Sequence, residues 1–430
     1  MTTPLRLGIA GLGTVGVGVV RIVERHADLL AARAGRPIQV TAVSARSRDK
    51  DRGIDLSAYR WEDDPVALAR ADDVDILIEL IGGDAGPAKA AVETAIAHGK
   101  DVVTANKAML ALNGQGLAEA AEAAGVALRF EAAVAGGIPV VKALTEGLAG
   151  NRVLRVMGVM NGTCNYILTR MQSAGLSYDE VFAEAESLGF LEADPTLDVG
   201  GIDAGHKLAL LAAIAFGTRI DFDLVALEGI ERISIDDIRA AADMGYAIKL
   251  LGVAQVGPQG LEARMSPCLV PVRHPLGQLD GATNMVVLEG DAAGQIVLRG
   301  AGAGSGPTAS AVMADVMEIA RGLRLPTFGQ RASDLATPQP AAANTPAPFY
   351  LRMALKDEPG ALAKIATCLG EAGISIDRMR QYDHADVTAP VLIVTHEATR
   401  GAIDTAIAAM TRTDALVGTP VALRIEMIES

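Results

Sequence analysis

A glycine-rich turn near the N-terminus limits what this chain can fold into more than any other stretch. Gly11-Leu12-Gly13-Thr14-Val15-Gly16 follows a predicted strand at 5–10 and opens a predicted helix that runs to about Ala32. Glycines at these spacings permit a tight turn and let a pyrophosphate approach the helix N-terminus. Between a strand and a helix, the motif predicts dinucleotide contacts from Gly11, Gly13, Thr14, Val15 and Gly16, and the alternative is a plain glycine turn.

The next hundred residues alternate between predicted strands and helices. This pattern predicts an α/β fold with a doubly wound, Rossmann-like parallel sheet, in which ligands bind beyond the carboxyl ends of the strands. Ala105-Asn106-Lys107 follows one such strand end, so Lys107 is a candidate functional residue, although a surface lysine in a loop is the alternative. The predicted strands are 38–43, 75–80, 102–104 and 126–130, and the predicted helices are 87–98 and 116–124.

The second predicted strand ends in Ser44-Ala45-Arg46-Ser47-Arg48. A site specific for NAD usually places Asp or Glu here to bind the ribose hydroxyls, whereas an arginine suits the 2′-phosphate of NADP. We therefore expect NADP, or NAD with tolerance of NADP, and Arg46 as the contact. A solvated loop that binds nothing is an equal alternative.

Composition argues against two classes of partner. The 430 residues carry a net charge of −14 and only 3% are aromatic, whereas a surface that binds nucleic acid needs a basic excess and stacking rings. The apolar run from Leu7 to Val20 is too short to span a membrane and lacks the layout of a signal peptide. Three widely spaced cysteines predict neither a disulfide framework nor a metal site. We expect a cytoplasmic protein without nucleic-acid or membrane partners.

Four carboxylates precede one lysine in the segment 192–207. Asp203 stands at a predicted helix start, where an acidic residue is favoured, and Lys207 lies four positions later on the same face. The apolar run 208–216 that follows would partly desolvate the lysine and make proton exchange easier. An ordinary i,i+4 ion pair is the alternative. The density of acids in a turn-rich segment favours a functional site.

After residue 151 the pattern changes to a predicted open mixed sheet. A strand at 153–160 leads into Asn161-Gly162-Thr163-Cys164-Asn165-Tyr166, which opens a helix whose backbone N–H groups and Thr163 hydroxyl could hold a small carboxylate. Cys164 lacks a neighbouring histidine that would activate it, so we interpret it as a buried structural cysteine. The further elements are a helix at 177–187 and strands at 248–256, 261–272, 285–288 and 295–298.

The last third of the chain is predicted to contain a segment that packs back onto the first domain, then a linker and a small folded domain. The glycines of 300–306 imply backbone pressed against the dinucleotide, and a helix at 308–321 follows them. Residues 330–348 are rich in Pro and Ala and predict an extended linker. The remaining elements follow the βαββαβ order of a ferredoxin-like unit, with strands at 350–356, 374–380, 390–395 and 421–428 and helices at 361–372 and 400–410.

The segment 192–207, taken with 161–166 and Asn106-Lys107, resembles the homoserine dehydrogenase family with a C-terminal ACT domain, over nearly the whole chain. The resemblance implies reversible NAD(P)-dependent interconversion of L-aspartate 4-semialdehyde and L-homoserine, in the biosynthesis of threonine, methionine and isoleucine. It implies that Lys207 is the acid/base, that Lys107 assists proton transfer or orients the nicotinamide and substrate, and that Asp203 holds Lys207 and the substrate hydroxyl.

The resemblance also implies binding residues. Glu192 and Asp198 would bind the substrate amino group, Gly162 and Thr163 would contact the substrate, and Gly302 would contact the cofactor. The turn-rich loop 131–139 offers one carboxylate and several carbonyls, and its composition alone favours a plain domain-crossing loop. By resemblance it would hold a monovalent cation (Na or K) through Glu131 and the carbonyls of Val134, Gly136 and Ile138.

The expected organisation has four parts. Asp357-Glu358-Pro359-Gly360 matches the first turn of an ACT domain, for which threonine is the expected effector. A homodimer or homotetramer is expected, because the mixed sheet and the ACT domain would otherwise leave edges open. The parts are 1–135 for dinucleotide binding, completed by 303–329, then 136–302 for substrate binding and catalysis, 330–348 as linker and 349–430 as the ACT domain.

Two other functions stay open at this point. An aspartate-semialdehyde dehydrogenase would share substrate and cofactor but needs an activated thiol, for which Cys164 would be the candidate. A non-enzymatic amino-acid sensor would retain only the nucleotide fold, and the Asp203/Lys207 pair argues against it.

Overall fold

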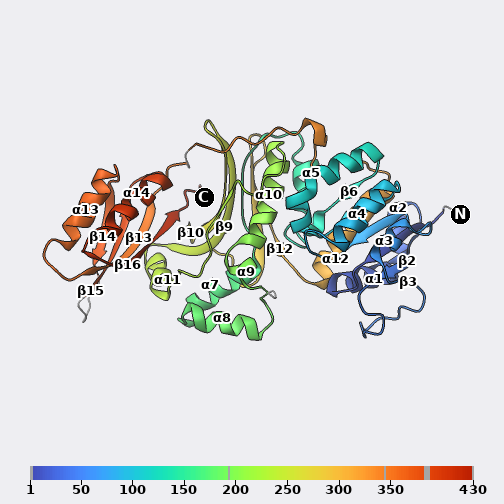
Figure 1. The fold of residues 1–430 in the computed structure, drawn as a ribbon, viewed down its shortest axis with the longest axis horizontal. Helices are drawn as coiled ribbons and strands as arrows, with labels where there is room; N and C mark the ends of the chain where they lie inside the picture. The colour runs from blue at the N-terminus through green and yellow to red at the C-terminus, as the bar shows by residue number, and fades with distance from the viewer. Residues whose placement is uncertain (1–2, 192–193, 343–344, 382–387, 429–430) are drawn as a thin grey trace.

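The structure is a computed structural model, and it describes residues 3–191, 194–342, 345–381 and 388–428. The molecule is elongated, with the N-terminal domain, a central sheet and the C-terminal unit lying in a row (Figure 1). Within the described residues, no helix has the length and apolar character needed to cross a membrane.

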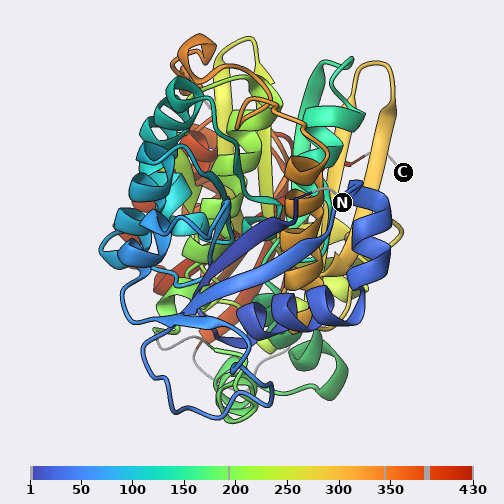
Figure 2. The same cartoon turned by 90° about the vertical axis from the view of Figure 1, so that its right-hand side faces the viewer.

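Six parallel strands form the N-terminal sheet, in the order β3-β2-β1-β4-β5-β6. This is the order of a dinucleotide-binding Rossmann fold, so the predicted doubly wound sheet is confirmed. Helices cover both faces (Figure 2), because alternate residues of a buried strand face opposite sides: Ile78 packs into one layer and Leu77 into the other. The elements are β1 Leu5–Ala10, α1 Thr14–Arg25, α2 Ala27–Ala34, β2 Ile38–Ser44, β3 Arg60–Glu62, α3 Pro65–Arg70, β4 Ile76–Glu79, α4 Pro87–Ala97, β5 Asp101–Thr104, α5 Lys107–Ala124 and β6 Leu128–Arg129.

Two predicted helices of this domain are wrong in detail, and two short elements were missed. The helix expected to run to Ala32 is broken at His26, whose backbone leaves the helical region (φ −115°, ψ 24°). The helix expected from Gly116 begins nine residues earlier, at Lys107, because the Asn106 side chain caps it by accepting from Met109 N. The short elements β3 and α3 were not predicted.

Helix α12 (Ser305–Ala320) returns the chain to the N-terminal domain. It packs against α1 so closely that a Cβ on Gly18 would lie 2.8 Å from Ser305 Oγ. Val312 and Val316 are buried in the same core as Leu7 and Ile9 of β1. The helix begins three residues before the predicted Thr308.

The central sheet contains the strand order β12-β11-β7-β9-β10, with β8 paired to β10. Helix α10 lies between this sheet and α5, so it connects the two domains (Figure 1). The predicted strands are confirmed, whereas β8, α9 and α11 were not predicted. The elements are β7 Val153–Val159, α7 Gly162–Ala174, α8 Tyr178–Ser187, α9 Thr196–Val199, α10 Ile202–Phe216, β8 Val225–Leu227, α11 Ile235–Asp243, β9 Tyr246–Gly257, β10 Gly260–Pro271, β11 Thr283–Gly290 and β12 Gly294–Ala301.

The C-terminal unit has the predicted ferredoxin-like order, with strands arranged β16-β13-β15-β14. Its sheet continues the central sheet, because Cys268 and Leu269 of β10 pair in parallel with Arg424 and Ile425 of β16. The segment 330–348 is not a free linker, since it pairs with the central domain at Leu261↔Pro340. The elements are β13 Phe349–Lys356, α13 Ala361–Glu371, β14 Ile376–Gln381, β15 Thr388–Thr395, α14 Arg400–Thr411 and β16 Leu416–Ile425.

Candidate active site

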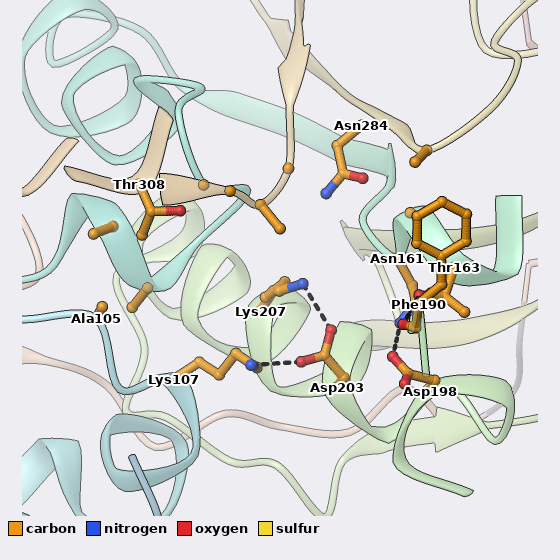
Figure 3. Close-up of a pocket in the computed structure, with 18 of the residues that line it drawn as sticks. Ala105, Lys107, Asn161, Thr163, Phe190, Asp198, Asp203, Lys207, Asn284 and Thr308 are labelled. Atoms are coloured by element: carbon orange, nitrogen blue, oxygen red, sulfur yellow. Dashed lines mark hydrogen bonds and ion pairs between the residues drawn. The ribbon is translucent and has the colours of Figure 1, made fainter. Parts of the chain in front are cut away.

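A cavity of about 570 Å³ is lined by residues from the first turns of α5, α7, α10 and α12, among them Lys107, Thr163, Asp203 and Thr308, which are labelled in Figure 3. Helix N-termini carry partial positive charge and unpaired N–H groups, so the cavity suits anionic ligands. Sequence-predicted site residues from both domains line it: Val15, Lys107, Gly136, Gly162, Thr163, Asp198, Asp203, Lys207 and Gly302.

One carboxylate holds two ammonium groups at the centre of the cavity. Asp203 Oδ1 lies 2.7 Å from Lys107 Nζ, and Asp203 Oδ2 lies 2.7 Å from Lys207 Nζ. Lys207 also donates to the carbonyl of Met160 at 2.8 Å. Burial alone would raise the pKa of Asp203, but the two ammonium groups outweigh it and hold that pKa well below its usual value. Asp203 therefore stays ionised and keeps both lysines aimed into the cavity.

Lys107 owes its position to the junction between β5 and α5. Asn106 caps α5 and also donates from Nδ2 to the carbonyl of Gly83 at 2.6 Å. The hydroxyl of Thr104 donates to buried Glu79 at 2.6 Å. These bonds fix the first residue of the helix, which is Lys107, at the carboxyl end of the sheet.

The opposite wall is built around the start of α7. Asn161 caps this helix by accepting from Cys164 N, and its Nδ2 donates to Asp198 Oδ1 at 2.9 Å. The Thr163 hydroxyl donates to the carbonyl of Phe190, so within the described residues its hydrogen is already used. Asp198 lies at this wall, while Glu192, predicted as its partner, lies outside the described residues.

The glycine turn fits a dinucleotide. A Cβ on Gly11 (φ 109°) would lie 2.4 Å from Leu80 O, and one on Gly16 would lie 2.1 Å from Gly11 O, whereas Gly13 faces open space. Helix α1 starts at Thr14 with neither a side-chain cap nor an acidic residue in its first turn. Its first N–H groups are therefore available to a pyrophosphate.

The other predicted cofactor residues are spread around this turn. Val15 and Gly302 line the cavity, and Gly302 packs so tightly that a Cβ would lie 2.1 Å from Asn284 Nδ2. Arg46 is exposed two residues after β2 and does not line the cavity.

The predicted cation loop lies beside the cavity. The buried Glu131 carboxylate accepts from the backbone N–H groups of Val141 and Lys142, each at 2.9 Å. Burial, together with Asp315, raises the pKa of Glu131 to about 7. Ala135 and Gly136 both have positive φ, which turns the backbone sharply between the carbonyls of Val134 and Ile138. A buried carboxylate in a loop with several backbone carbonyls offers the oxygen ligands that a hard cation prefers, and a bound cation would favour the ionised form of Glu131, so the residues present fit such an ion.

Sequence reasoning missed several cavity residues, among them Asn161, Asn284, Phe190 and Thr308. Asn161 was detectable, because an Asn directly before a helix is a capping signal. Asn284 had no local signal, since it reaches Met160 O, the carbonyl that also accepts from Lys207, only through tertiary structure.

Cys164 is unsuited to nucleophilic catalysis. It is fully buried, its Sγ contacts the carbonyl of Asp198 at 3.2 Å, and burial raises the pKa of its thiol well above the usual value. The thiolate that a thioester mechanism needs is thereby disfavoured.

Comparison with known proteins agrees with this geometry. Family models described as "Homoserine dehydrogenase", "Homoserine dehydrogenase, NAD binding domain" and "ACT domain" match residues 139–317, 11–131 and 349–412. The chain is 42% identical to a homoserine dehydrogenase of Neisseria gonorrhoeae and 41% identical to one of Pseudomonas aeruginosa, with 99% of each chain covered in both cases. The chain belongs to the homoserine dehydrogenase family.

Solved structures of homoserine dehydrogenases share this architecture in whole or in part. One from Thiobacillus denitrificans is 41% identical with a TM-score of 0.93, covering 99% of this chain and 98% of that one. A hyperthermophilic archaeal homoserine dehydrogenase in complex with NADPH is 25% identical with a TM-score of 0.63, covering 76% of this chain and 100% of that one. The predicted NAD(P)-dependent oxidoreductase with an ACT domain is thus confirmed at the level of the homoserine dehydrogenase family.

Proposed function

We propose that this chain catalyses the reversible NAD(P)-dependent reduction of L-aspartate 4-semialdehyde to L-homoserine. The observation that carries the proposal is the Lys107–Asp203–Lys207 arrangement, with both Nζ–O distances at 2.7 Å, in a cavity between the glycine-turn domain and the central domain. A carbonyl reduction builds negative charge on oxygen, and fixed ammonium groups stabilise that charge and supply a proton.

Lys207 is the acid/base in this proposal. An ammonium has three N–H donors, and among the described residues Met160 O and Asp203 Oδ2 accept two of them. The third is available to the aldehyde oxygen, which takes the proton as the carbonyl carbon is reduced. In the oxidation direction, the neutral lysine accepts the hydroxyl proton of homoserine. Lys107 adds positive charge and orients the reactants.

The substrate is an amino acid, and the proposed site has a binding group for its ammonium and another for its carboxylate. Asp198, with Glu192, binds the ammonium group of the substrate. The first turn of α7 at Gly162 and Thr163 receives the carboxylate through backbone N–H groups, in accordance with the charge of a helix N-terminus. The hydroxyl of Thr163 is not needed for this, because it already donates to Phe190 O.

The cofactor would lie across Gly11, Gly13, Thr14, Val15 and Gly16, with Gly302 on its far side and Arg46 at a 2′-phosphate. When bound, the dinucleotide supplies or removes the hydride. Tight backbone contacts at Gly11 and Gly16 support this placement. A monovalent cation (Na or K) would be held by Glu131 and the carbonyls of Val134, Gly136 and Ile138.

The division of the chain and its regulation are also proposals. Residues 1–135 with 303–329 bind the dinucleotide, 136–302 bind the substrate, 330–348 connect, and 349–430 form a regulatory ACT domain with threonine as effector, in a cytoplasmic homodimer or homotetramer. Support comes from α12 packing into the N-terminal core and from the ACT match. Threonine inhibition of the full-length chain, absent in a variant with a disrupted ACT domain, is the expected result.

The test is a steady-state assay of L-homoserine oxidation with NADP and with NAD. Turnover is expected with at least one nucleotide. Lys207→Ala should lower kcat by about 10²–10⁴-fold while binding of the dinucleotide stays intact. The matched control is Lys89→Ala, which removes a lysine on α4, outside the cavity, whose ion pair among the described residues is with Glu93. Equal kcat values for Lys207→Ala and the unaltered protein would refute the assignment.

A further inference from the structure

Lys249 is a buried lysine that the proposed chemistry does not use. It is the fourth residue of β9, its side chain is 2% exposed, and it does not line the cavity. Burial of an ammonium is unfavourable unless the group is paired or hydrogen-bonded. Burial lowers the pKa of Lys249 to about 8, and the Asp280 carboxylate opposes this only in part. Met or Leu would fill the same space without that penalty, so the ammonium calls for another explanation.

The contacts of Lys249 connect two separate segments of the chain. Its Nζ donates to the carbonyl of Leu279 and, at 3.2 Å, to Asn165 Oδ1 on the first turn of α7. The Asn165 amide closes the network, because its Nδ2 donates to Leu279 O at 3.1 Å and to Gly281 O at 2.7 Å. The carboxylate of Asp280 is 3.9 Å away and its side chain is 74% exposed. The partners that Lys249 holds are therefore mainly neutral oxygens of these two segments.

These two segments form one end of the cavity. Ala282 and Asn284 line it from the strand side, and Gly162 lines it from α7. They touch, since a Cβ on Gly162 would lie 2.7 Å from Ala282 O. A small shift of residues 279–282 relative to α7 would therefore change the cavity where it meets the helix N-terminus.

We propose that Lys249 is a positioning residue for the amino-acid substrate, because it fixes the 279–282 segment against the first turn of α7. The inference rests on the proposed function, in which that turn receives the substrate carboxylate. The glycine turn 11–16, which would hold the dinucleotide, lies in the other domain, and in the described part of the chain no hydrogen bond joins it to Lys249, Asn165 or 279–282. Loss of the Lys249 ammonium should therefore weaken use of homoserine and leave use of the dinucleotide unchanged.

The variants are Lys249→Met, Asn165→Asp and Lys100→Met. Asn165→Asp keeps an oxygen for Lys249 but loses the N–H donors to Leu279 and Gly281. Lys100→Met is the matched control, because it removes a buried lysine whose ammonium donates to a backbone carbonyl, Ala71 O, in the dinucleotide domain. The measurements are KM for homoserine, KM for NADP and amide hydrogen exchange of peptides that cover 161–168 and 274–284.

Lys249→Met is expected to raise KM for homoserine about 10-fold or more, with KM for NADP unchanged and faster exchange in both peptides. Asn165→Asp should change the same quantities in the same direction, and it carries the test if Lys249→Met does not fold. Unchanged KM for homoserine, or an equal rise for Lys100→Met, would overturn the inference. If the unaltered protein does not oxidise homoserine, the proposed function fails, while unchanged exchange in the two peptides separately refutes the role of Lys249.

Discussion

Asp203 is the residue whose removal would be most informative. Its single carboxylate pairs with both Lys107 and Lys207, at 2.7 Å from each. Asp203→Asn keeps the shape but leaves two ammonium groups facing each other in a largely buried site. Like charges disfavour the protonated forms, so the high-pH limb of the rate profile for aldehyde reduction should move to lower pH.

We expect Asp203→Asn to lower kcat of reduction at least about 10-fold at pH 7 and more at higher pH. The measurement is kcat against pH from 6 to 10, with Asp194→Asn as control, because Asp194 is exposed and, among the described residues, its carboxylate accepts from Thr196 alone. A profile with unchanged shape for Asp203→Asn would mean that the carboxylate does not tune the lysines.

The raised pKa of Glu131 leads to a prediction about the stability of the protein. Its pKa is raised to about 7, so between pH 4.5 and 7 the folded state binds more protons than the unfolded state. Stability therefore falls as pH rises through this window, by at most ~3 kcal/mol from this group. Glu131→Gln should lack that fall. Urea unfolding at pH 5, 6, 7 and 8 measures it as a difference between the two proteins in the slope of the free energy of unfolding against pH.

A bound cation should reverse the effect at Glu131, because it favours the ionised carboxylate. NaCl or KCl should then stabilise the unaltered protein at pH 8 more than at pH 5, compared with equal choline chloride. The same salts should not distinguish the two pH values in Glu131→Gln. Equal responses to these salts in the unaltered protein and in Glu131→Gln would rule out a cation site in this loop.

At the scale of elements, two glycines of the turn have different roles. Gly16 is needed for the turn to fold, and Gly13 leaves space for the pyrophosphate. Gly16→Ala places a methyl group 2.1 Å from a backbone carbonyl, so the turn must shift, whereas a methyl on Gly13 meets open space. We expect Gly16→Ala to lose about 1–3 kcal/mol of stability. Gly13→Ala should keep its melting temperature and still bind NADP at least about 10-fold more weakly, because the methyl occupies the space left for the pyrophosphate. Thermal unfolding and nucleotide fluorescence titration measure the two effects.

The elements show what the sequence could and could not predict. Strong apolar periods predicted most strands of both sheets, although not the short strands β3 and β8, and turn glycines marked the dinucleotide motif. Helix α5 was predicted too short because Gly114 and Gly116 lower helix propensity, while Gly114 is required by close packing on Ile220 and Phe328. The break at His26 lacks a Gly or Pro to signal it.

The site was predictable to a similar degree. Asp203 and Lys207 share a helical face, so their pairing followed from spacing alone. The contact of Asp203 with Lys107, 96 positions away in the chain, needed the packing of α10 on α5 and could not be derived from local pattern. Asn284 and Lys249 were missed for the same reason.

At the scale of the whole molecule, β10 and β16 join the central domain to the ACT domain. Behind this joint, buried Glu426 accepts from Arg155 of β7 and from Arg264 of β10, and lies 3.5 Å from Arg424 Nε. Burial alone would raise the pKa of Glu426, but these arginines hold it below its usual value. A residue that follows the ACT strands thus completes the interior of the central domain.

Glu426→Gln should therefore destabilise the catalytic part of the molecule. Breaking a buried ion pair leaves an uncompensated charge, and about 3–5 kcal/mol is expected. Urea unfolding followed by loss of activity would measure it, with exposed Glu397→Gln as control. A loss below about 1 kcal/mol would show that the arginines find other partners. Truncating the chain within 330–348 would also remove Glu426 and the stability that it provides, so threonine inhibition is best tested on the full-length chain.

The Glu426 network has a consequence for how the protein is made. Arg264 emerges from the ribosome 162 residues before Glu426, so until Glu426 is made, the carboxylate that pairs with Arg264 is Glu262, at 3.3 Å. We expect the central domain to gain stability when the end of the ACT domain is translated. A prematurely terminated chain would then carry the proposed catalytic residues in a less stable domain, which ties full stability of the catalytic part to the presence of the ACT domain.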